Sequence, residues 1–159
     1  MVQCRMITRR QMSLILGSLG ASSAHAQPQK TGTTIHFEVD YKTTPDRIYE
    51  VLLDAKKFAA CSGLTAEIDP RPGGTFKLFS GQIEGRTVEL IPNRRIVQAW
   101  RPASWPAGEY SIARFELTPR GARTHIVFDH AGFTADKQEH LAEGWEEHYW
   151  APLHKYLNA

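Results

Sequence analysis

The sequence predicts an α+β domain in which an antiparallel β-sheet is covered by a long C-terminal helix. Strand-like segments separated by short turns fill residues 73–129. Connections of this length cannot hold crossover helices, so neighbouring strands should pair antiparallel. Residues 134–157 then carry an amphipathic helical pattern, whose apolar stripe must be buried against the sheet. The length fits one domain with one hydrophobic core.

The N-terminal segment is expected to be a signal peptide. It contains three arginines and no acidic residue, a short apolar stretch over residues 12–19, and the small-residue site Ala24-His25-Ala26. The stretch Thr8–Met12 is similar to a twin-arginine export signal. We expect a signal peptide over residues 1–26, a flexible linker over 27–32, the domain over 33–159, and a periplasmic or secreted protein after cleavage near Ala26. The alternative is a cytoplasmic protein whose N-terminal segment is not a true signal.

Charge and cysteine content argue against nucleic-acid or membrane partners and against an intramolecular disulfide. After removal of residues 1–26 the chain carries 16 basic and 17 acidic side chains, so it has no positive surplus to attract nucleic acid or an anionic membrane. Within the N-terminal segment, the apolar stretch over residues 12–19 is too short to span a bilayer. Cys61 is then the sole cysteine, so no disulfide can form within the mature chain, and we interpret it as a small core residue.

The first elements are a strand and two short helices. Apolar and polar side chains alternate from Ile35 to Asp40, the period of a half-buried strand over residues 33–41. Thr44-Pro45 supplies a helix cap and a proline for the first turn. Ser62-Gly63 ends the helical region. We therefore expect one helix from Pro45 to about Ala55 and a second helix over residues 56–61. Extended chain should follow over residues 64–69.

A run of strands follows, each ended by turn-forming residues. The strands are expected over residues 75–79, 83–91, 96–100, 111–118 and 124–129. The turns are Ser80-Gly81, Pro92-Asn93 and Pro119-Arg120-Gly121. A larger loop over residues 101–108 carries Trp105 between two prolines.

The last element is a long helix that begins after Thr134, a candidate cap. One apolar residue recurs every four positions, as expected for a single buried stripe. The stripe consists of Leu141, Trp145, Tyr149, Leu153 and Leu157. Pro152 cannot donate a hydrogen bond to the carbonyl of His148, so we predict a bend between these two residues.

Short motifs distributed along the domain carry a family resemblance. They are Tyr41-Lys42-Thr43-Thr44-Pro45, Gly73-Gly74-Thr75-Phe76, Gly85, Glu89-Leu90-Ile91-Pro92, Trp100-Arg101, Ser104-Trp105-Pro106, and Gly144-Trp145 with Tyr149. From residue 34 to 157 the chain resembles the C-terminal domain of the activator of heat-shock protein 90 ATPase family, within the START-like (SRPBCC) superfamily. The resemblance implies the helix-grip fold, in which a curved antiparallel sheet wraps around the long helix and a cavity can remain between them.

Three functions are compatible with this resemblance. The first hypothesis is a non-catalytic domain that binds a small apolar or amphipathic molecule between the C-terminal helix and the sheet. The second is a protein-interaction module, as the family's co-chaperone role implies, with Trp105 as its candidate partner-binding residue. The third is a cyclase or hydratase, activities known among START-like domains, with His130 moving a proton. Heat-shock protein 90 and ATP belong to the cytosol, whereas the predicted signal directs export, so the first hypothesis is preferred.

The candidate ligand-binding residues are mainly aromatic. They are Phe76, Trp100, Tyr110, Phe115, Phe128, His130, Trp145 and Tyr149. Large aromatic side chains suit either the wall of an apolar pocket or a packed core alone, and both interpretations stay open. His130 shares strand parity with Phe128, so it should lie on the inner face near the cavity mouth, or else bond to a loop carbonyl.

No catalytic, metal or cofactor signature is present in the sequence. A G-x-S-x-G motif is missing, and no catalytic residue is assigned. Two scattered sets of possible metal ligands were considered, His125 with Asp129, and His140 with Glu143 and Glu147. Neither has a known ligand spacing, so we interpret both as solvated side chains and predict no metal and no cofactor.

Overall fold

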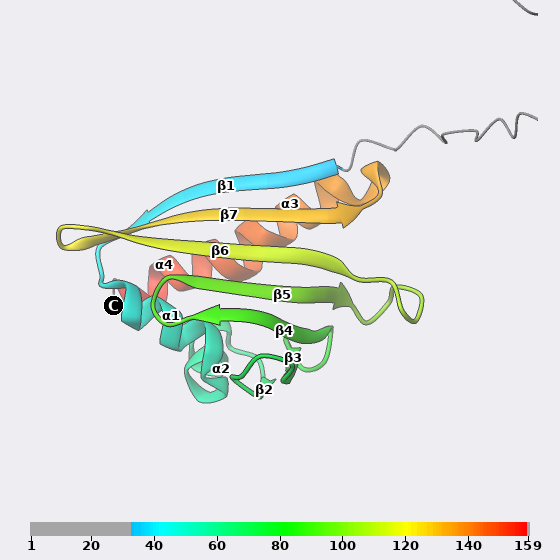
Figure 1. Cartoon of the computed structure of the whole chain (residues 1–159), viewed down its shortest axis with the longest axis horizontal. Helices are drawn as coiled ribbons and strands as arrows, with labels where there is room; N and C mark the ends of the chain where they lie inside the picture. Colours follow the sequence, from blue (N-terminus) through cyan, green and yellow to red (C-terminus); the bar gives the residue numbers. More distant parts are fainter. Residues whose placement is uncertain (1–32, 159) are drawn as a thin grey trace, which may run out of the picture.

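The structure is a computed structural model in which residues 33–158 are described (Figure 1). The predicted signal peptide (residues 1–26) and linker (residues 27–32) lie outside the described residues. The elements follow the predicted order of one strand, two short helices, a set of strands and a C-terminal helical region. No helix in this part of the chain is both long and apolar enough to cross a membrane.

All strands between residues 33 and 158 belong to one antiparallel sheet. They are β1 (Thr33–Tyr41), β2 (Glu67–Ile68), β3 (Thr75–Leu78), β4 (Ile83–Ile91), β5 (Arg95–Pro102), β6 (Ser111–Arg120) and β7 (Arg123–Phe133). Their order across the sheet is β1-β7-β6-β5-β4-β3-β2. The segment β2 to β7 is therefore the predicted meander, and β1 pairs with β7 at the far edge. The extended segment predicted over 64–69 pairs with β3 only at β2.

Two short helices, α1 (Pro45–Leu53) and α2 (Ala55–Ser62), connect β1 to the meander and confirm the prediction. Pro45 occupies the first turn of α1, but the Thr44 hydroxyl makes no capping bond to the helix backbone. The cap with a side-chain bond is Asp54, whose carboxylate accepts a hydrogen bond from the backbone N–H of Lys57 at 2.9 Å. Gly63, with a φ of 76°, ends α2.

The C-terminal helical region contains a wide turn where the sequence predicts a bend. Its parts are η1 (Ala135–Lys137), α3 (Gln138–Trp145), η2 (Glu146–Trp150) and α4 (Ala151–Leu157). Because Pro152 has no N–H to donate, the backbone adopts a π-helical turn over η2, in which the N–H of Ala151 donates to the carbonyl of Glu146. The helix then continues, so the irregularity is a π-turn rather than a break. Thr134 precedes η1 without a side-chain capping bond.

The C-terminal helical region covers one face of the curved sheet, and the core lies between them (Figure 1). All five residues of the predicted stripe are buried, with Trp145 only 1% exposed. The sequence pattern did not identify Trp150, which is also buried because the π-turn brings two adjacent side chains, Tyr149 and Trp150, to the inner face. The predicted helix-grip architecture is therefore confirmed.

Candidate functional site

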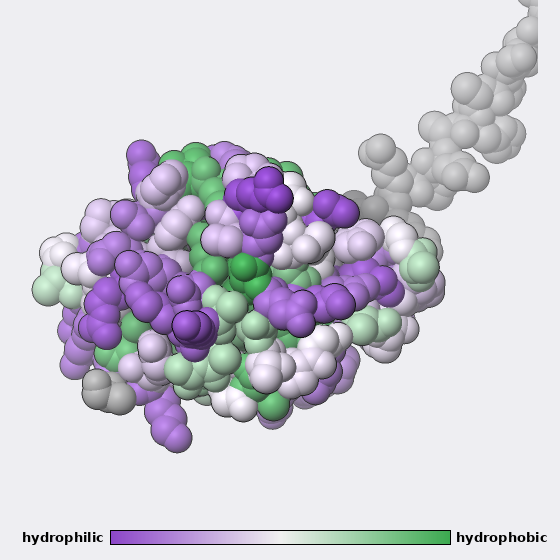
Figure 2. Space-filling view, turned by 90° about the horizontal axis from the view of Figure 1, so that it is seen from below, coloured by the Kyte–Doolittle hydropathy of each residue, from purple (hydrophilic) through white to green (hydrophobic). Residues whose placement is uncertain are grey.

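A cavity of about 680 Å³ lies between the C-terminal helical region and one end of the sheet. Its walls come mainly from the end of β5 with the following loop, the turn between β3 and β4, and one side of the helical region. The lining residues are Leu64, Phe79, Ser80, Gly81, Gln82, Ile83, Trp100, Pro102, Ala103, Ser104, Trp105, Lys137, His140, Leu141, Gly144, Trp145, His148 and Tyr149. This volume is typical of small-molecule sites, which span about 300–1,000 Å³. Figure 2 shows apolar side chains reaching the surface between hydrophilic groups on the side of the β2 and β3 edge.

The inner wall of the cavity is a group of packed aromatic rings. Trp145 lies 4.1 Å from Tyr149 and 5.4 Å from Trp100, measured between ring centroids. The indole N–H of Trp100 donates to the Tyr149 hydroxyl at 3.3 Å, so these two buried polar groups satisfy each other. Burial raises the pKa of the Tyr149 hydroxyl, which therefore stays protonated. The wall is apolar and offers no charge to a ligand.

The turn between β3 and β4 forms a second side of the cavity and has an unusual backbone. Phe79, Ser80 and Gly81 have φ values of 53°, 56° and 86°, all in the left-handed region. A bulky residue there is uncommon, and such conformations are held only where surrounding contacts fix them. Here the ring of Phe79 packs at 5.2 Å from both Phe58 and Tyr149. The predicted turn is confirmed, and these ring contacts hold it against the helices.

The loop after β5 folds over the cavity and brings Trp105 into its lining. The guanidinium of Arg101 donates to the carbonyl oxygen of Trp105 and, at 2.7 Å, to the carboxylate of Glu84. Trp105 packs edge-on against Trp100 with centroids 6.3 Å apart, and the Lys137 ammonium lies 4.2 Å from its ring centre. Trp105, the candidate partner-binding residue, is half-buried because these contacts hold it against the cavity.

The predicted ligand-binding residues other than His130 lie in three places: the cavity wall, the core and the surface. Trp100, Trp145 and Tyr149 line the cavity, whereas Phe76, Phe115 and Phe128 are not part of the lining. These three phenylalanines are at most 2% exposed because they pack deep between the sheet and the helix. Tyr110 is 45% exposed and lies outside the cavity, near Arg101. For the three phenylalanines the structure favours the alternative of a packed core, whereas Tyr110 belongs to neither the cavity nor the core.

His130 is fully buried in a directional chain of hydrogen bonds. Its Nδ1 accepts from the indole N–H of Trp145 at 2.8 Å, which fixes the neutral tautomer with the proton on Nε2. That Nε2–H donates to Ser111 Oγ at 2.6 Å, and the Ser111 hydroxyl donates to the carbonyl of Trp100 at 2.9 Å. Burial lowers the pKa of His130 to about 4.

His130, held by this chain of bonds, lies outside the cavity lining. It lies on the inner face, as its strand parity predicts, but it does not line the cavity. Its partners are Trp145 and Ser111 rather than a loop carbonyl. Both ring nitrogens are occupied, so it has no free position from which to move a proton to or from a molecule in the cavity. The cyclase or hydratase hypothesis loses the residue on which it depended.

Four lining residues from the C-terminal helical region were missed by the sequence analysis. They are Lys137, His140, Gly144 and His148. Their spacing of i, i+3, i+7 and i+11 is the signal that could have found them, because it defines one stripe of a helix beside the buried one. The considered set of His140 with Glu143 and Glu147 does not converge: only His140 faces the cavity, and both glutamates are exposed.

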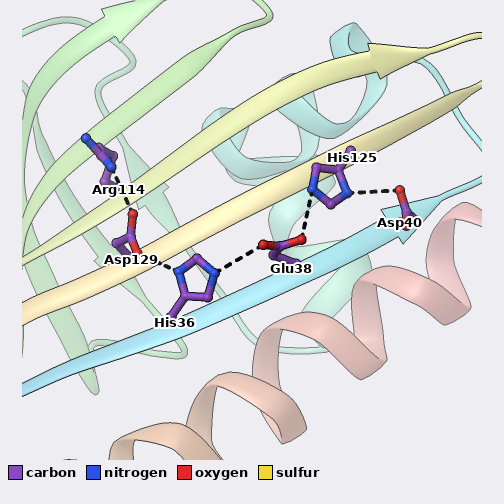
Figure 3. A network of polar contacts seen from close by, with 6 residues as sticks. All are labelled: His36, Glu38, Asp40, Arg114, His125 and Asp129. Atoms are coloured by element: carbon purple, nitrogen blue, oxygen red, sulfur yellow. Dashed lines mark hydrogen bonds and ion pairs between the residues drawn. The ribbon is translucent and has the colours of Figure 1, made fainter.

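A separate polar network covers the sheet face opposite the helix (Figure 3). His36 and Glu38 from β1 bond to Asp129 and His125 from β7, and Arg114 from β6 bonds to Asp129. The hydrogen bond to Asp129 raises the pKa of His36. Among residues 33–158, no three His, Cys, Asp or Glu side chains are placed to hold a metal ion together. The network is a set of cross-strand ion pairs on the outer face.

The comparison with protein families identifies the domain. A family model described as "Activator of Hsp90 ATPase homolog 1-like protein" matches residues 42–158. The chain belongs to this family. The match covers the elements from the start of α1 to the end of α4, and so includes all the segments that form the cavity.

Curated members of the Hsp90 ATPase activator family are similar to this chain over part of their length. Activator homolog 2 from Mus musculus is 26% identical over 140 residues, which are 85% of this chain and 42% of that protein. Activator homolog 1 from Homo sapiens is 26% identical over 110 residues, which are 69% of this chain and 32% of that protein. The match thus spans less than half the length of these relatives.

Solved structures of the family have the same fold. An HSP90 activator from Plasmodium falciparum superposes with a TM-score of 0.73 at 25% sequence identity, covering 79% of this chain and 96% of that chain. The Aha1 dimer from Colwellia psychrerythraea superposes with a TM-score of 0.67 at 19% identity, covering 79% of this chain and 96% of that chain. At the latter identity the likeness concerns the fold alone.

Proposed function

We propose that this Hsp90-activator-family domain binds a small apolar or amphipathic molecule in the cavity between the C-terminal helical region and the sheet. The observation that supports the proposal is the cavity itself, about 680 Å³ in volume and walled by Trp100, Trp145 and Tyr149. Removal of apolar surface from water drives such binding, and the few polar groups at the rim orient the molecule. In keeping with the predicted signal peptide, we place this activity outside the cytoplasm.

Gly144 offers a direct test of this proposal. It lines the cavity from α3, and a Cβ added at this position meets no atom within 4 Å. A larger side chain would therefore extend into the empty space, and the loss of a helical glycine favours folding. We expect Nile red, an uncharged apolar dye, to brighten on binding the full chain, and Gly144→Leu to weaken its binding about tenfold or more, which corresponds to about 1.4 kcal/mol.

The matched control is Gly144→Ala, which adds one methyl group and should retain dye binding. Thermal unfolding of both variants checks that the fold is intact. If Nile red does not bind the wild-type protein, or binds Gly144→Leu as tightly as wild type, the cavity is not the binding site and the proposal fails.

A second candidate function is the protein interaction that the family name indicates. Its support is the set of curated relatives named as activators of a 90 kDa heat shock protein ATPase. Addition of the purified domain to such an ATPase should raise ATP turnover, and Trp105→Ala should reduce the effect, because this residue anchors the loop after β5. Unchanged turnover together with no detectable complex would contradict this second function.

A further inference from the structure

The polar groups that line the cavity share one electrostatic character. Lys137 is the one formally charged lining residue, His140 and His148 contribute imidazoles, and the remaining polar side chains are uncharged. No Asp or Glu is part of the lining, although residues 33–158 hold 17 acidic and 15 basic side chains. The one formal charge among the lining side chains is therefore positive, within a domain whose net charge is slightly negative.

Lys137 is held at the cavity by two contacts. Its ammonium lies 4.2 Å from the ring centre of Trp105 and 3.4 Å from a carboxylate oxygen of Glu109. The Lys137 side chain is 28% exposed, whereas that of Glu109 is 52% exposed, so the ammonium is the more enclosed of the two partners. Glu109 does not line the cavity. The carboxylate partner of Lys137 therefore comes from outside the lining.

Two histidines add hydrogen-bonding groups to the cavity along the helix. The imidazoles of His140 and His148 make no hydrogen bond to any residue in the described part of the chain, and both are exposed. They lie on the same helix stripe as Lys137, and the ring of His148 packs 5.9 Å from that of Phe79. Each can donate an N–H to an acceptor in the cavity.

From these observations we infer that the bound molecule is an apolar carboxylic acid, such as a medium-chain fatty acid, held as its anion. The inference rests on the proposed function, because it specifies the ligand of the same cavity. The carboxylate pairs with the Lys137 ammonium and takes the place of Glu109, while His140 or His148 donates a further hydrogen bond. The hydrocarbon part lies against Trp100 and Trp145. Charge-assisted hydrogen bonds of this type are stronger than neutral ones.

A series of ligands with equal chain length tests the charge preference. Decanoate, decanol and decyltrimethylammonium each compete with Nile red for the full chain, at concentrations below micelle formation. We expect decanoate to bind about tenfold more tightly than decanol, and the cation to bind most weakly. A cation that binds as tightly as decanoate would overturn the inference.

Three variants locate the preference at Lys137. Lys137→Gln should reduce decanoate affinity about tenfold and leave decanol affinity unchanged. Glu109→Gln removes the competing carboxylate and should raise decanoate affinity severalfold. Lys155→Gln is the matched control, because Lys155 is exposed on α4 and does not line the cavity, and it should change neither affinity.

The outcomes distinguish a failure of the inferred anion preference from a failure of the proposed binding function. If decanol binds as tightly as decanoate and Lys137→Gln changes neither, the cavity still binds apolar molecules and the inference about the anion is wrong. If neither decanol nor Nile red binds, the proposed function and the inference fall together. Thermal unfolding of Lys137→Gln shows whether a loss of affinity reflects the charge or the fold.

Discussion

Acidification should destabilise this domain through His130. The unfolded chain exposes an imidazole with a pKa of about 6.5. The folded chain buries the same ring between Trp145 and Ser111, and burial lowers its pKa to about 4. Between these two pH values the unfolded state binds a proton that the folded state does not. The free energy of unfolding therefore falls as the pH is lowered from about 6.5 to about 4, and is unaffected by this group above that range.

The size of the effect follows from the difference between the two pKa values. Each pKa unit corresponds to about 1.4 kcal/mol, so His130 accounts for about 3 kcal/mol between neutral pH and pH 4. Domains are stable by only about 5–15 kcal/mol, so this one group represents a large share of the total. Protonation would also remove the acceptor at Nδ1 and leave the buried indole N–H of Trp145 without its partner.

The assay is urea unfolding, followed by tryptophan fluorescence, of wild type and His130→Gln across a pH series. A glutamine can still accept from Trp145 and donate to Ser111, but it does not titrate. Carboxylates titrate in both proteins, so they cancel in the difference between the two free energies of unfolding. That difference should shrink by about 3 kcal/mol on going from pH 7 to pH 4. A difference that does not vary with pH, or an NMR titration of His130 near its unfolded pKa, would refute the reasoning.

Three further predictions concern other parts of the domain. Gly85→Ala should reduce the free energy of unfolding by about 2–4 kcal/mol in urea titrations, because the added Cβ would lie 2.0 Å from a backbone carbonyl oxygen of β5, whereas Gly144→Ala, in open space, should not destabilise. His36 should titrate above its ordinary pKa of 6.5 by NMR, since its bond to Asp129 favours the charged ring. Its stabilising contribution is then complete below about pH 6.5 and is lost as the pH rises through the raised pKa. It should be smaller in Asp129→Asn, in which Glu38 is the remaining acidic partner. Burial raises the pKa of the Cys61 thiol to about 11, so Ellman's reagent near neutral pH should modify it slowly in the folded chain and rapidly in urea, and equal rates would contradict this.

The fold could be predicted from sequence because its signals are local and repeated. Alternation from Ile35 to Asp40 specifies a strand, and the turns at Ser80-Gly81 and Pro92-Asn93 separate strands that must then pair antiparallel. A stripe with a period of four positions specifies a buried helix face. The π-turn over η2 could not be predicted in the same way. A proline indicates that the helix is irregular, but it does not specify whether the backbone bends, breaks or forms a π-turn.

The candidate site could be predicted only in part. Strand parity correctly places Phe128 and His130 on the inner face, but it does not show whether a side chain lies in the core or at the cavity. Whether an inward side chain meets core or cavity depends on which helix residue lies opposite. The cavity opens where Gly144 presents no side chain and where the loop after β5 folds back, and both are tertiary features. Lys137 and His148 were missed for the same reason, since polar helix residues ordinarily face water.

Trp145 connects the core to the cavity and limits how the site can change. Its indole N–H is the partner of the buried His130, while its ring also lines the cavity. Truncation of Trp145 to enlarge the cavity would leave Nδ1 of His130 without a donor, at a cost of about 1–3 kcal/mol in addition to the lost packing. If the cavity binds a ligand as we propose, its preference should therefore be easiest to change at lining positions without a role in the core. Gly144 and Lys137 are such positions, because one leaves open space and the other sets the charge of the cavity.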